Sequence, residues 1–80
     1  MEYLKMDKKL QQVFSNSLGV PLQRVEDDLK YSEAVEWDSV AHMALIAAIE
    51  EAFDIMIDAE DVIDMSSFGK AKLIVAKYLS

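Results

Sequence analysis

Residues 36–55 read EWDSVAHMALIAAIEEAFDI, and this stretch decides the fold that we expect. From Ser39 onward its apolar residues recur at three- and four-residue spacing, which predicts an amphipathic helix over residues 39–53 that ends near Asp54. The stripe expected to be buried contains six residues: Leu45, Ile46, Ala48, Ile49, Ala52 and Phe53. A neighbouring face of the same helix carries Val40, Met43 and Ala47.

The same spacing predicts three more helices. They cover about residues 2–17, 59–64 and 68–79. Gly19 is expected to stop the first helix, since glycine is the preferred residue just past a helix end. Asp58 is expected to cap the third helix, and Ser66 or Ser67 to cap the fourth.

Two connections join these helices. Residues 20–37 are long for a loop without secondary structure, and such loops are often functional. Seven spaced apolar residues are expected to pin the loop across the bundle: Val20, Leu22, Val25, Leu29, Tyr31, Val35 and Trp37. Residues 55–57 are expected to form an extended link, because nothing is available for them to pair with. The sequence therefore predicts an all-α protein: a small four-helix bundle with a long first loop and a short third helix, and residues 1–80 as a single domain.

Composition narrows the function. The 80 residues include no Cys, so disulfides, thiolate metal sites and a cysteine nucleophile are excluded. The net charge is -7, and 13 of the 15 acids lie between Glu26 and Asp64, against one base, Lys30. Phosphates would repel this surface, so neither a nucleic acid nor an anionic membrane is an expected partner. With no signal peptide and no run of 18 apolar residues, we expect a cytoplasmic protein.

Ser39 is the candidate for chemistry. It stands where the long loop meets a helix, and a helix N-terminus offers unpaired N–H groups and the positive end of the dipole to a phosphate. Asp38 would supply a carboxylate at the same place, for a metal ion or a basic group of a modifying enzyme. A plainer interpretation makes Ser39 only the cap of its helix.

The order and spacing of these segments resembles the acyl carrier protein family. The resemblance rests on residues 38–40 (DSV), 50–55 (EEAFDI), 66–68 (SSF) and 18–20 (LGV), and it covers nearly the whole chain. It implies that Ser39 receives 4'-phosphopantetheine from coenzyme A through a phosphopantetheinyl transferase, assisted by Asp38. The thiol of that arm would carry acyl groups as thioesters, and the chain itself would be a monomeric carrier and not an enzyme.

The resemblance also implies a partner surface on the second helix, which would meet basic patches of acyl- or aminoacyl-loading and acyl-transfer enzymes. Carried over to this chain, it comprises Asp38, Val40, Met43, Ala47, Glu50 and Glu51. The chain departs from the family pattern at four positions: Val40 stands where Leu is common, Glu36 where Gly is, and Ala41 and Ala44 where acids are. These departures, with Trp37 and His42, favour a specialised lipid, polysaccharide or secondary-metabolite pathway over ordinary fatty acid synthesis.

Alternatives remain at this point. A stand-alone peptidyl or aminoacyl carrier would share the fold and the cofactor, and an unmodified acidic interaction module would share only the fold. A hydrolase with His42 as the base of Ser39 is disfavoured, because Asp38 adjoins the serine and does not orient the imidazole. The acids of residues 54–64 lack the spacing and central Gly of a calcium loop, so no metal site is expected.

Overall fold

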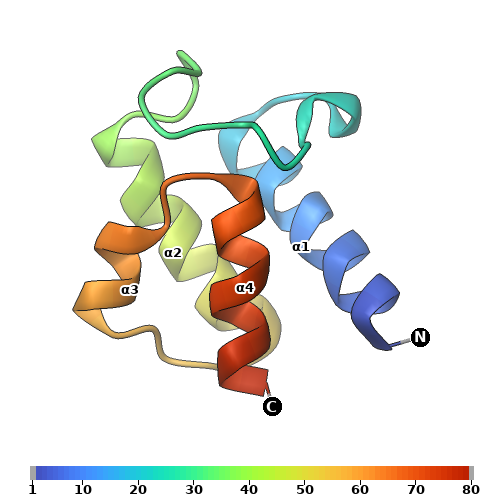
Figure 1. Ribbon diagram of the computed structural model, residues 1–80. Coiled ribbons are helices and arrows are strands. Elements are labelled where there is room, and N and C mark those ends of the chain that lie inside the picture. The colour runs from blue at the N-terminus through green and yellow to red at the C-terminus, as the bar shows by residue number, and fades with distance from the viewer. Residues whose placement is uncertain (1, 80) are drawn as a thin grey trace.

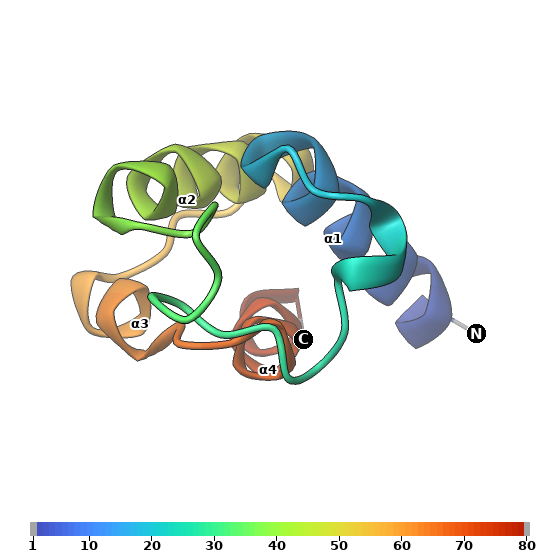
Figure 2. The ribbon, with the colours of Figure 1, turned by 90° about the horizontal axis from the view of Figure 1, so that it is seen from above.

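The computed structural model describes residues 2–79, with side chains for residues 5–79, and it consists of helices joined by loops. The elements are α1 (Glu2–Leu18), the 3-10 turn η1 (Leu22–Arg24), α2 (Ser39–Phe53), α3 (Ala59–Asp64) and α4 (Phe68–Leu79) (Figure 1). Within residues 2–79 there is no strand, only an isolated bridge between Lys30 and Ser67. The predicted all-α bundle is confirmed. In the view from above, α1 and α2 form one side, and α3 and α4 lie opposite (Figure 2).

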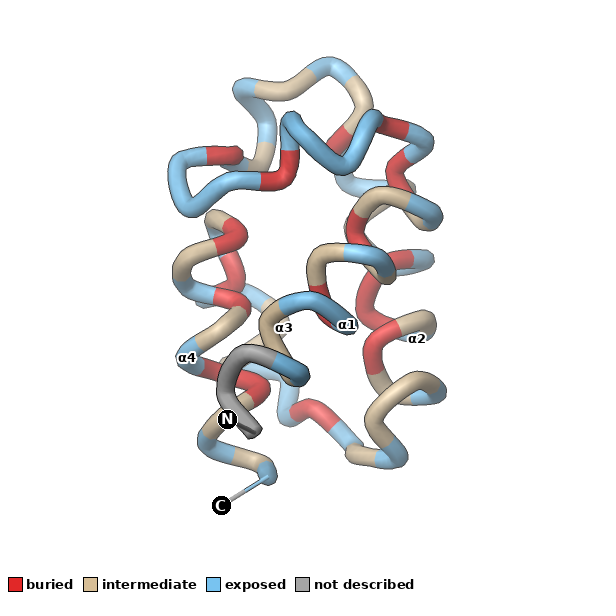
Figure 3. The backbone as a smooth tube through the Cα atoms, turned by 90° about the vertical axis from the view of Figure 1, so that its right-hand side faces the viewer, coloured by how far each residue is buried: buried red, intermediate tan, exposed pale blue. Residues whose placement is uncertain are grey.

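Large aromatic side chains fill the centre of the bundle. Phe14 of α1 packs edge-on against both Trp37 and Phe68, with ring centroids 5.3 and 5.0 Å apart. The buried residues face inward from every helix except α3, which packs through half-buried side chains (Figure 3). On α2, Leu45, Ile46 and Ile49 are buried, and the other three residues of the predicted stripe are half-buried.

Two helices end in the same way. At the end of α1, Gly19 takes a φ of 70°, and the N–H groups of Gly19 and Val20 both donate to the Ser15 carbonyl. At the end of α2, Asp54 takes a φ of 55°, and the N–H groups of Asp54 and Ile55 both donate to the Glu50 carbonyl. The predicted stops at Gly19 and near Asp54 are therefore confirmed, each with a left-handed residue just past the helix and the 6→1 hydrogen bond of a Schellman motif.

The predicted caps are confirmed in position. Ser67, the second of the two candidates, caps α4, because its Oγ accepts from the Lys70 N–H at 3.0 Å. Asp58 precedes α3 but makes no side-chain capping bond, and its own N–H donates to the Tyr78 hydroxyl at 2.9 Å.

The long loop crosses one end of the bundle and is bound to the start of α4 (Figure 1). The Leu29 carbonyl accepts from the Phe68 N–H, and the Ser66 carbonyl accepts from the Tyr31 N–H, each at 3.0 Å. Val20, Val25, Leu29 and Trp37 are buried as predicted, and Tyr31 is half-buried.

The prediction fails at two of the seven apolar anchors in this loop, and the loop is not structureless. Leu22 is 39% exposed because it lies in η1, on the surface of the molecule. Val35 is 92% exposed. It lies in a turn in which the Lys30 carbonyl accepts from the Ala34 N–H and the Trp37 carbonyl accepts from the Ser32 N–H. Apolar spacing alone does not identify which loop residues face the core, because a loop has no fixed period.

Candidate functional site

Asp38 caps α2. Its backbone is extended, with φ -96° and ψ -174°, and its Oδ1 accepts from the Ala41 N–H at 2.8 Å. Ser39 is therefore the first residue inside the helix and not its cap, so the interpretation of Ser39 as a simple capping residue is wrong.

The Ser39 hydroxyl is exposed and takes no part in capping α2. No residue of the part the structure describes hydrogen-bonds to this hydroxyl. Within the same described range, the N–H groups of Ser39 and Val40 have no acceptor. A phosphodiester on Ser39 Oγ would lie beside these two free donors and the positive end of the α2 dipole. The residues present thus fit a covalently attached phosphate group.

The loop holds Asp38 and Ser39 in place. Arg24 of η1 donates to both carboxylate oxygens of Glu36, at 2.8 and 3.1 Å. The hydrogen bond from Arg24 holds the pKa of the Glu36 carboxyl below its usual value. Trp37, which follows directly, is 0% exposed, and its carbonyl accepts from the Ser32 N–H at 3.0 Å. The pair of Arg24 and Glu36 is half-exposed and contributes little stability, so the buried Trp37 is the main anchor.

His42 bridges three parts of the fold. Its Nδ1 lies 2.9 Å from Trp37 Nε1, and its Nε2 lies 2.8 Å from the Val62 carbonyl oxygen of α3. The indole Nε1–H is only a donor, so Nδ1 must be the acceptor, and the imidazole proton is on Nε2, which donates to Val62. The imidazole and indole rings are nearly parallel, with an interplanar angle of 27° and centroids 5.8 Å apart. Both ring nitrogens are thus occupied away from Ser39, and the nucleophile–base pair that a hydrolase needs is not formed.

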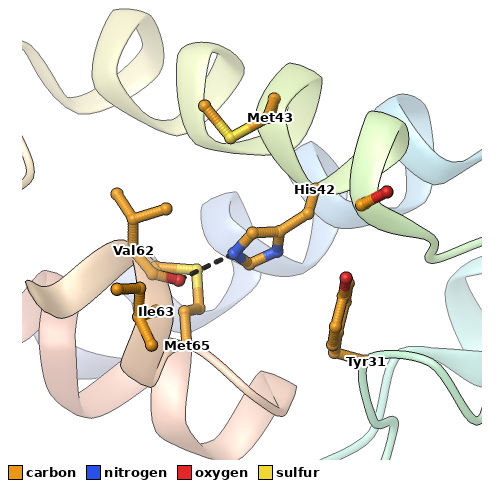
Figure 4. A pocket seen from close by; sticks show the side chains of 7 residues that line it. Tyr31, His42, Met43, Val62, Ile63 and Met65 are labelled. Carbon is orange, nitrogen blue, oxygen red and sulfur yellow. Dashed lines mark hydrogen bonds between the residues drawn. The ribbon is translucent and has the colours of Figure 1, made fainter. Parts of the chain in front are cut away.

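A pocket of about 350 Å³ opens beside Ser39, between α2 and α3 (Figure 4). Most of the surface that lines the pocket is apolar. Seven residues contribute to this lining: Tyr31, Ser39, His42, Met43, Val62, Ile63 and Met65. Figure 4 shows the His42 ring crossing from α2 toward Val62, with Tyr31 on its other side. Sequence reasoning missed this role of His42, as its partner in α3 is 20 residues away along the chain.

The residues of the predicted partner surface are differently placed. Val40 and Met43 are 79% and 61% exposed, and Ala47 and Glu51 are also exposed. Glu50 is half-buried, and its Oε2 accepts from the Ile57 N–H at 2.9 Å, so it fastens the link that leads to α3. The surface beside Ser39 is consequently more apolar than the chain's net charge suggests.

Among residues 5–79, whose side chains the structure describes, no three His, Asp or Glu side chains are placed together to hold a metal ion. None of the helices described there has both the length and the apolar character required to cross a membrane.

The fold is a small helical bundle, and Ser39 stands exposed at the N-terminus of α2. A family model described as "Phosphopantetheine attachment site" matches residues 8–70. The chain belongs to this family of phosphopantetheine-bearing carriers and, within it, to the acyl carrier proteins. It is 33% identical over 64 residues to the acyl carrier protein of Cyanidium caldarium, covering 80% of this chain and 74% of that protein. It is 29% identical over 66 residues to that of Buchnera aphidicola subsp. Schizaphis graminum, covering 82% and 84%.

The family supplies the cofactor and the general role. Acyl carrier proteins bear a covalently attached 4'-phosphopantetheine, which supplies the thiol group that this cysteine-free chain lacks. They are carriers and not catalysts, and they interact with a phosphopantetheinyl transferase and with acyl-handling enzymes.

Proposed function

We propose that Ser39 is the attachment point of 4'-phosphopantetheine, and that residues 1–80 act as one monomeric carrier domain. The observation that carries this proposal is the division of tasks at the start of α2: Asp38 caps the helix, and the exposed hydroxyl of Ser39 stays free. In the transfer, Ser39 Oγ forms a bond to the phosphorus that bears the pantetheine. The pyrophosphate bond of coenzyme A breaks, adenosine 3',5'-bisphosphate leaves, and the hydroxyl proton passes to a base of the transferase.

The test is the intact mass after incubation with coenzyme A, Mg²⁺ and a broad-specificity phosphopantetheinyl transferase. The wild type should gain one phosphopantetheine, and Ser39→Ala should gain none. Ser66→Ala is the matched control, since Ser66 is also exposed but stands before α4, and it should be modified like the wild type. Modification of a folded Ser39→Ala protein would refute the assignment of this residue.

We propose that partner enzymes dock on the exposed face of α2. Val40, Met43 and Ala47 form its apolar part, and Asp38 and Glu51 add negative charge toward basic patches of the partners. Glu50 contributes less than the family resemblance implies, because its carboxylate already accepts a backbone hydrogen bond. The front of the helix has no acid after Asp38, which supports a specialised lipid, polysaccharide or secondary-metabolite pathway, with aminoacyl or peptidyl cargo as the second candidate.

A charge placed on this face should disrupt docking without disturbing the fold. Met43→Glu is expected to lower the kcat/KM of the transferase roughly tenfold, because a buried interface contact is replaced by a charge. Leu73→Glu is the matched control, since Leu73 is 70% exposed and belongs to a different helix, α4. Equal effects of the two variants would contradict this docking face.

A further inference from the structure

The His42 bridge forms part of the wall of the pocket beside Ser39. The apolar walls include Met43 of α2 and Ile63 of α3, and the His42 imidazole spans the space between the two helices (Figure 4). Its Nε2–H donates to the Val62 carbonyl, and its Nδ1 accepts from Trp37. The bridge is therefore fixed at both ends.

Behind the bridge, aromatic rings occupy the core. The His42 ring lies beside Trp37, which is fully buried and packs edge-on against Phe14, and Phe14 packs in turn against Phe68. Tyr31 covers the other side of the imidazole, with ring centroids 5.2 Å apart. The His42 ring thus lies between the pocket that it lines and the buried rings of Trp37, Phe14 and Phe68, which do not line the pocket.

Passing the bridge is unfavourable. An acyl chain that displaced the imidazole would leave the Trp37 N–H and the Val62 carbonyl without partners in a partly buried site. Unsatisfied buried polar groups cost as much free energy as the burial of several methylenes provides. The pocket in front of the bridge remains available at no such cost.

We propose that His42, as a neutral imidazole protonated on Nε2, closes the pocket beside Ser39 and limits this carrier to sheltering short acyl groups. The inference rests on the proposed attachment at Ser39. It makes His42 a specificity-determining residue that acts through Trp37 and Val62, and it assigns longer acyl tails to the solvent or to the partner enzyme.

The experiment loads the protein with acetyl-, butyryl- and octanoyl-phosphopantetheine from the matching acyl-coenzyme A and measures Tm for each form. Intact mass is checked first, so that a failure of attachment at Ser39 is recognised separately from a failure of the pocket. In the wild type, Tm should rise no further between butyryl and octanoyl. In His42→Ala, the octanoyl form should exceed the butyryl form by roughly 3–6 °C for each additional methylene that becomes buried.

The His42→Gln variant distinguishes the effect of the hydrogen-bonded bridge from the effect of side-chain size. Its amide oxygen can accept from Trp37 and its amide N–H can donate to Val62, so the wild-type profile should return. A Gln variant with the Ala profile would overturn the bridge as the closing element. A wild type whose Tm keeps rising to octanoyl, or an Ala variant whose profile runs parallel to the wild type, would overturn the proposal.

A second measurement needs no variant and so does not depend on His42→Ala remaining folded. Long-range ¹H–¹⁵N spectra of the wild type report which imidazole nitrogen carries the proton. The expected pattern has an unprotonated Nδ1 and a protonated Nε2, in the unmodified protein and in the octanoyl form alike. An Nδ1–H tautomer, or a change of tautomer on loading with octanoyl, would contradict a closed bridge.

Discussion

Asp38 and Ser39 are neighbours that divide two tasks between them. The Asp38 carboxylate caps α2 through the Ala41 N–H, while the Ser39 hydroxyl has no partner among the described residues. If both tasks fell to Ser39, modification of its oxygen would remove the cap. The division lets the arm be attached without loss of the hydrogen bond that starts the helix.

The two roles of Asp38 can be separated by substitution. Asp38→Ala removes the cap and should lower the free energy of unfolding by about 0.5–2 kcal/mol, as measured by urea denaturation. Asp38→Asn should retain most of that stability, because Asn caps helices about as well as Asp. The Asn variant still lacks the negative charge, so its rate of modification by the transferase should fall if the carboxylate assists the transfer.

The contrary results are equally informative. An Asp38→Asn variant modified at the wild-type rate would reduce Asp38 to a cap. An Asp38→Ala variant as stable as the wild type would show that the hydrogen bond to Ala41 adds nothing to the stability of α2.

At the scale of elements, local signals were sufficient for the helices. Each helix carries its own apolar period and its own end signals, so α2, α3 and α4 have the predicted bounds and α1 extends one residue further, to Leu18. The position of Ser39 at the start of α2 was predictable for the same reason, since a serine at a loop–helix junction is a local pattern. Its role as the attachment point stays a prediction.

Features that depend on distant residues were not predictable. The path of the long loop depends on hydrogen bonds such as that of Leu29 with Phe68, and the role of His42 depends on a carbonyl in α3. Glu50 looked like a surface acid because it stands beside Glu51, yet it accepts from the Ile57 N–H beyond the helix end. In each case the partner is fixed only once the helices have packed.

The left-handed residues that end α1 and α2, Gly19 and Asp54, give a matched pair of substitutions. Gly19→Ala places a side chain at a φ of 70° and should destabilise the protein by about 1–2 kcal/mol. Asp54→Gly relieves a φ of 55° but makes the unfolded chain more flexible, so its net effect should lie between zero and about 1 kcal/mol of stabilisation.

Urea denaturation of both variants measures these changes. No atom lies within 4 Å of the position that a side chain at Gly19 would occupy, so the expected loss comes from the backbone and not from a clash. An unchanged Gly19→Ala stability, or a destabilised Asp54→Gly variant, would contradict this interpretation of the helix ends.

At the scale of the whole molecule, one acidic side chain, Asp61, joins two helices. Asp61 of α3 accepts from Lys77 Nζ, at 2.7 and 2.9 Å, and from the Tyr78 hydroxyl, both on α4. The hydrogen bond from Lys77, and then that from Tyr78, holds the pKa of the Asp61 carboxyl below its usual value. The same contacts raise the pKa of Lys77 and of Tyr78. α3 buries no residue of its own, and these hydrogen bonds join it to α4.

The direction of these shifts predicts how stability depends on pH. Because the folded-state pKa of Asp61 is lowered, its contribution is fully present above the ordinary carboxyl value of about 4 and is lost as the pH falls below it. Asp61→Asn should therefore have a lower Tm than the wild type at pH 7, and the two values should converge toward pH 3. The remaining carboxylates titrate in both proteins, so the difference isolates Asp61.

Asp64→Asn, an exposed acid of the same helix, is the control and should track the wild type throughout. A difference for Asp61→Asn that stays constant from pH 7 to pH 3 would mean that the neutral Asp61 carboxyl ties α3 to α4 as well as the carboxylate does.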